Sequence, residues 1–165
     1  LIPLEFCFEA LKGVARATTR NIEFFVTKDF PSGDLVKVTN IAGISDSKRN
    51  EYLAKAHFNL LLSLDHSSKG FYEGFGLTVL EAGIFATPSI VSPYGGLPEA
   101  CHHRDTGWVL PLTVSYFQKL IKSLSGESYK RVSEACYSHT LSSHKEELYD
   151  GLINTLINRG ENRGQ

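Results

Sequence analysis

Residues 73–81 of this chain read Glu-Gly-Phe-Gly-Leu-Thr-Val-Leu-Glu. Two carboxylates, Glu73 and Glu81, lie eight residues apart around a Gly-Phe-Gly turn, and Glu81 is the only charged residue between Glu73 and Glu99. A carboxylate in so apolar a run is expected to be partly buried and to need hydrogen-bond donors. Sugar hydroxyls would supply such donors, and so would backbone amides.

The residues after the turn predict a short helix over 77–86, with Leu77, Leu80 and Ile84 facing the core. A glycine turn ahead of a helix offers unpaired N–H groups and the positive end of the helix dipole, which suit an anion such as phosphate. Carboxylates for hydroxyls and amides for phosphate together predict a sugar-nucleotide site.

Strand-like and helical patterns alternate along the chain. Strands are predicted over residues 22–26, 35–41, 58–64, 88–92 and 108–110. Further helices are predicted over residues 3–17, 48–56, 114–124, 129–138 and 143–157. This alternation predicts an α/β, Rossmann-like fold, a parallel sheet with right-handed crossovers and flanking helices. The glycine turn and the glycine-rich loop 93–98 each follow a strand, so both should line the same edge of the sheet.

Composition fits one ordinary globular domain, which we place at residues 1–159 with a frayed tail at 160–165. The 165 residues are 42% hydrophobic and 21% charged, with a net charge of −1, so no nucleic-acid partner is expected. Three widely spaced cysteines predict free thiols and a cytoplasmic location, with a disulfide as the less favoured alternative. No apolar run approaches the ~20 residues of a membrane-spanning helix, and the first residues do not resemble a signal peptide.

The motifs occur in a characteristic order. Glu-x7-Glu is followed by Thr87-Pro88, by Gly-Gly-Leu-Pro-Glu over residues 95–99, and by Thr-Gly-Trp-Val-Leu-Pro over residues 106–111. In this order and spacing the chain resembles the C-terminal, donor-binding domain of GT-B glycosyltransferases of the large retaining family 4. The likeness runs from about residue 41 to 156 and implies that the chain is the C-terminal half of a GT-B fold.

The resemblance implies a role for each motif residue. It assigns Glu81 to the ribose hydroxyls of the nucleotide, and Glu73 to the donor sugar as the catalytic residue. The remaining donor-binding positions are the turn amides near sugar and diphosphate, the base-binding strand end and the second glycine loop: Gly74, Phe75, Gly76, Leu77, Thr78, Gly43, Ile44, Gly95 and Gly96. Each assignment has an alternative, because Glu81 could be structural, Glu73 merely solvated, and Gly95 and Gly96 only a turn that shapes the cleft.

The chain departs from this family in three respects, the first being that a helix usually found between two strands is reduced to a short turn at residues 29–34. Family members carry a Gly-Arg…Lys segment that would precede Leu1, and an N-terminal domain that binds the acceptor. We therefore expect a fragment of a hexosyl- or related glycosyltransferase, inactive alone, whose N-terminal domain could attach the full-length protein peripherally to a membrane. The parent reaction would move a sugar from a nucleotide-sugar to an acceptor hydroxyl with retention, in polysaccharide, lipopolysaccharide or glycoconjugate synthesis.

Two other functions remain open at this point. The chain could be a non-catalytic nucleotide-sugar-binding or interaction module, or part of a related GT-B sugar-nucleotide epimerase. No cofactor is expected, since the nucleotide-sugar is a substrate. No metal is expected either, because the chain has no Asp-x-Asp pair and His102-His103 has no ligand at a suitable spacing.

Overall fold

The computed structural model describes residues 3–18, 21–64 and 74–143 of the chain. Its helices are α1 Pro3–Thr18, α2 Asp46–Lys55, α3 Leu77–Gly83, α4 Leu97–Ala100, α5 Val114–Ser123 and α6 Gly126–Ser143. Its strands are β1 Ile22–Val26, β2 Val36–Asn40, β3 Asn59–Leu61, β4 Ser89–Val91 and β5 Gly107–Val109. Every predicted strand is present within a few residues, whereas the predicted helix at 143–157 and the tail at 160–165 lie outside the described residues.

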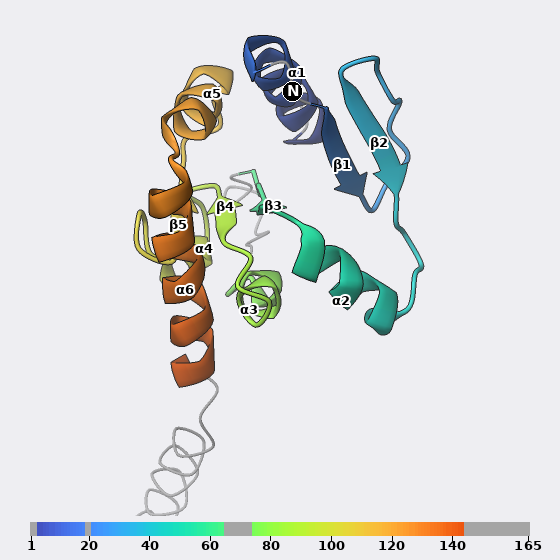
Figure 1. Ribbon diagram of the computed structural model, residues 1–165. Helices are drawn as coiled ribbons and strands as arrows, with labels where there is room; N and C mark the ends of the chain where they lie inside the picture. The colour runs from blue at the N-terminus through green and yellow to red at the C-terminus, as the bar shows by residue number, and fades with distance from the viewer. Residues whose placement is uncertain (1–2, 19–20, 65–73, 144–165) are drawn as a thin grey trace, which may run out of the picture.

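The strands form two parallel sheets (Figure 1). One pairs β1 with β2, from Ile22 opposite Val36 to Val26 opposite Asn40. The other has the order β3-β4-β5. The predicted α/β class, with parallel strands flanked by helices, is confirmed. Within the described residues the strands are divided between two sheets, since no hydrogen-bonded ladder joins them.

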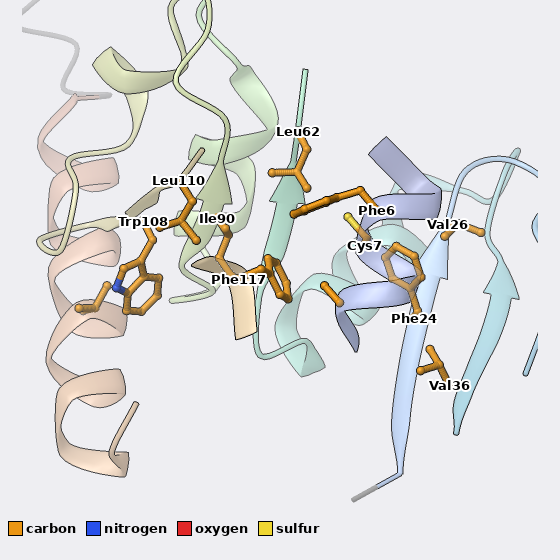
Figure 2. Close-up of a cluster of buried hydrophobic side chains, with 12 residues drawn as sticks. Phe6, Cys7, Phe24, Val26, Val36, Leu62, Ile90, Trp108, Leu110 and Phe117 are labelled. Carbon is orange, nitrogen blue, oxygen red and sulfur yellow. The ribbon is translucent and has the colours of Figure 1, made fainter. Parts of the chain in front are cut away.

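One apolar core spans both sheets and holds them in one fold. It joins Phe24 of β1 to Leu62 and Ile90 of the other sheet, and α1 contributes Phe6 (Figure 2). The Phe6 ring packs edge-on against Phe117 of α5, with 6.1 Å between ring centroids. Burial of this apolar surface replaces a ladder as the connection between the sheets.

A second, smaller core lies under α3 and α4. It consists of Val79, Val91, Leu97, Ala100 and Cys101. Helix α4 was not predicted, because four residues are too few to show a helical period.

Two side chains of the predicted α3 core face solvent instead. Leu80 is buried as predicted, but Leu77 is 66% exposed and Ile84 is 47% exposed. The helix ends at Gly83 rather than near residue 86. Ala86 has a φ of 56°, its N–H donates to the Gly83 carbonyl, and the Thr87 N–H donates to the Ala82 carbonyl. This left-handed C-terminal cap stops the helix and turns the chain toward β4.

Two further residues have clear structural roles. Ser45 caps α2, its hydroxyl accepting a hydrogen bond from the Lys48 N–H. Trp108 is a core residue, 4% exposed. No helix among the described residues is long and apolar enough to cross a membrane.

Candidate donor site

The two glycine-rich segments meet, as predicted for loops at one sheet edge. The Gly96 N–H, in the loop after β4, donates to the Gly74 carbonyl ahead of α3, at 2.9 Å. A Cβ atom at Gly96 would overlap the Gly74 carbonyl oxygen and crowd the backbone of Phe75. Glycine at 96 is therefore required for this close approach of two backbones.

Gly76 turns the chain into α3. Its φ is +76°, in the left-handed region, and it is the N-terminal cap residue of the helix. A Cβ there would lie 2.6 Å from Leu97 Cδ2 and 3.2 Å from Leu61 Cδ2. Strand β3 and helix α4 therefore both pack on this turn. No side-chain hydrogen bond caps α3, within the residues that are described.

The first turn of α3 is also fixed by Asn59 of β3, which was not predicted from the sequence. The Asn59 side-chain amide donates to the Thr78 carbonyl at 3.3 Å and to Ser89 Oγ at 3.0 Å. It thereby ties β3 and β4 to the helix that carries Glu81. The other candidate side chains of this segment point outward, Phe75 being 42% exposed.

Glu81 is half-buried on α3, as predicted. Its side chain is 39% exposed, and its Oε1 lies 3.6 Å from Nη2 of Arg49 on α2. No hydrogen bond from a described residue reaches its oxygens, and the nearest charged group among the described residues is the Arg49 guanidinium. Arg49 was not predicted because it lies 32 positions before Glu81, and only the tertiary fold brings the two side chains together.

Gly43 and Ile44 lie in the turn between β2 and α2. Gly43 has a φ of +71°, and the Ala42 N–H donates to Asn40 Oδ1 at 2.8 Å, which closes the turn. Gly43 and Ile44 therefore follow β2, which belongs to the β1-β2 sheet. They precede α2, the helix that carries Arg49 beside Glu81. Gly95, with a φ of +61°, lies next to Gly96 in the second glycine loop.

Comparison with known proteins identifies the family. Residues 35–138 match the family model described as Glycosyl transferases group 1. The chain belongs to this family. The matched range contains every described residue of the candidate site, from the turn after β2 to the loop after β4.

A curated glycosyltransferase resembles part of this chain. The amylovoran biosynthesis glycosyltransferase AmsK of Erwinia amylovora is 31% identical over 80 residues, which are 48% of this chain and 19% of AmsK. The chain therefore matches about a fifth of that relative's length.

The fold is similar to that of a solved structure. Alr3699/HepE of Anabaena, solved in complex with UDP and glucose, superimposes with a TM-score of 0.57 at 14% identity, covering 76% of this chain and 32% of that one. The C-terminal domain of LpcC, a glycosyl transferase group 1 family protein from Francisella tularensis, gives a TM-score of 0.49 at 20% identity, covering 67% and 54%.

Two candidate features of the sequence remain, the catalytic candidate Glu73 and the histidine pair His102-His103. Glu73 lies outside the described residues, so its catalytic role stays a prediction. The rings of His102 and His139 lie close together at a tilted angle, with 4.7 Å between their centroids. The described part of the chain holds no group of three or more His, Cys, Asp or Glu residues that could bind a metal ion.

Proposed function

We propose that this chain binds the nucleotide-sugar donor of a retaining glycosyltransferase. The observation that carries the proposal is the state of Glu81. Its carboxylate is partly exposed and accepts no hydrogen bond from any described residue. It lies on the helix that follows the glycine turn, which is held by the hydrogen bond from the Gly96 N–H to the Gly74 carbonyl. A carboxylate in this state can accept hydrogen bonds from a pair of vicinal hydroxyls such as those of ribose.

The neighbouring backbone suits the rest of a nucleotide-sugar. The junction of Gly74 with Gly96 removes side chains where a diphosphate and sugar would approach. The turn at Gly43 and Ile44 would hold the base, and Glu73 would lie beside the sugar. Charge on the departing diphosphate would be stabilised by fixed backbone dipoles, the usual means of stabilising developing charge in an enzyme.

The proposed biological role is synthesis of a polysaccharide, lipopolysaccharide or other glycoconjugate. The name of AmsK assigns that relative to amylovoran biosynthesis, which supports a biosynthetic rather than a degradative reaction for this chain. Alr3699/HepE was solved with UDP and glucose, which supports a nucleotide and a hexose as the ligands to test first.

Calorimetric titration of the purified chain with UDP-, GDP-, dTDP- and ADP-sugars tests the proposal. We expect saturable binding of one nucleotide class, with the free nucleoside diphosphate competing and the free sugar alone binding far more weakly. Absence of heat with all four classes at millimolar ligand would contradict donor binding.

A further inference from the structure

Arg49 links helix α2 to the candidate site. Its Nη2 atom lies 3.5 Å from Asp46 Oδ1 on its own helix and 3.6 Å from Glu81 Oε1 on α3. The Arg49 side chain is 43% exposed. It stands between two carboxylates, one of which belongs to the proposed donor site.

Neither of these contacts is a full hydrogen bond. A guanidinium carries five N–H donors, yet both carboxylate contacts of Arg49 are at or beyond the usual hydrogen-bond range. Its Nε is buried and has no partner within the described part of the chain. Arg49 is therefore held beside Glu81 by attraction between opposite charges.

This ion pair is a weak candidate for a purely stabilising role. Pairs as exposed as Arg49 and Glu81 contribute little to folding stability, because water and salt screen them. The pair nevertheless has a geometric consequence. Oε1 of Glu81 faces Arg49, which restricts the rotamers of the carboxylate and leaves Oε2 without a described partner.

We propose that Arg49 is a positioning residue of the donor site, holding the Glu81 carboxylate oriented toward the hydroxyls of the nucleotide. This inference rests on the proposed function. Without the cation, Glu81 samples more rotamers, and binding must order it. Ordering one such side chain corresponds to about a three- to tenfold loss of affinity.

A double-mutant cycle measured by calorimetry tests this role. UDP, GDP, dTDP and ADP are titrated into the wild-type chain, and the nucleotide bound most tightly is used throughout. We expect Arg49→Gln to weaken binding about three- to tenfold and Arg49→Lys to weaken it less, with melting temperatures close to wild type. In Arg49→Gln/Glu81→Gln the affinity should equal that of Glu81→Gln alone, because no carboxylate remains to be positioned.

Lys48→Gln is the matched control. It removes one positive charge from the same helix, but Lys48 pairs with Glu51 at 2.7 Å rather than with Glu81. We expect its affinity to equal that of wild type, which would exclude a general loss of attraction for an anionic ligand.

The outcomes separate this inference from the proposed function. If Glu81→Gln weakens binding while Arg49→Gln does not, or if their effects multiply in the double variant, the positioning role is wrong and donor binding stands. If no nucleotide binds the wild-type chain, or if Glu81→Gln binds nucleotide as tightly as wild type, the proposed function and the positioning role of Arg49 are both wrong. In either case Glu81 does not bind the hydroxyls of a nucleotide, so its orientation cannot affect affinity.

Discussion

The Gly96 N–H donates to the Gly74 carbonyl at 2.9 Å, joining the loop after β4 to the turn before α3. Residues distant in the sequence thus share one rigid backbone junction. Gly76 then directs α3 away from that junction, and α3 presents Glu81 beside Arg49. The arrangement of the candidate site depends on contacts that only glycine allows.

Gly96→Ala should destabilise this junction. The φ of Gly96 is −80°, which alanine adopts readily, so the effect would come only from overlap of its Cβ with the Gly74 carbonyl. Overpacking against backbone typically costs about 1–3 kcal/mol. Urea unfolding measures this loss. Gly126→Ala is the control, because its Cβ would meet nothing within 4 Å, and it should be neutral or slightly stabilising. Equal stabilities of the two variants would contradict the account.

Ala86→Gly should stabilise the chain. Ala86 ends the α3 region with a φ of 56°, a conformation that costs an alanine but not a glycine. We expect a gain of up to about 1 kcal/mol, measured as a rise in melting temperature. Ala54→Gly, at an exposed position within α2, makes the same chemical change and should cost about 1 kcal/mol. A loss of stability in Ala86→Gly would show that the left-handed cap does not form.

The three cysteine thiols should be unreactive in the folded chain. The structure confirms that they are free and buried. Burial raises the pKa of Cys7 and of Cys101 to about 12, and that of Cys136 to about 11. Because the thiolate is the reactive form, modification by a disulfide reagent at pH 8 should be at least about a hundredfold slower than in denaturant. Rapid reaction of any of the three before unfolding would contradict this burial.

The same pKa shifts make stability depend on pH. Unfolded thiols ionise near their ordinary pKa of 9.0, while the native thiols stay protonated to higher pH. The contribution of these thiols to the free energy of unfolding is thus complete below pH 9 and is lost as the pH rises toward 11–12.

The sequence predicted what depends on local pattern and on the order of motifs. The strand at Ile22–Val26 and the cap at Ser45 follow from short-range preferences. The meeting of the two glycine loops follows from the rule that parallel strands end at one edge. Helical period correctly predicted the start of α3 at Leu77 but not its end, because the left-handed turn at Ala86 follows a helix that stops at Gly83.

Partners from distant elements could not be predicted. Asn59 fixes the first turn of α3 because the fold brings β3 against that helix, and Arg49 of α2 faces Glu81 because the fold places the two side chains together. Neither residue stands out in the sequence by charge pattern or motif. The break between the two sheets also had no local signal, since every strand involved has the expected composition.

The most direct test of donor binding is one variant measured in two ways. Glu81→Gln keeps the shape of the side chain but removes its charge and one acceptor. A hydrogen bond to a charged group is worth about 1.5–3 kcal/mol, so nucleotide affinity should fall about ten- to a hundredfold in calorimetry. The melting temperature should change little, because the exposed pair with Arg49 stabilises the fold weakly. Unchanged nucleotide affinity together with a clearly lower melting temperature would contradict the account and make Glu81 a structural residue.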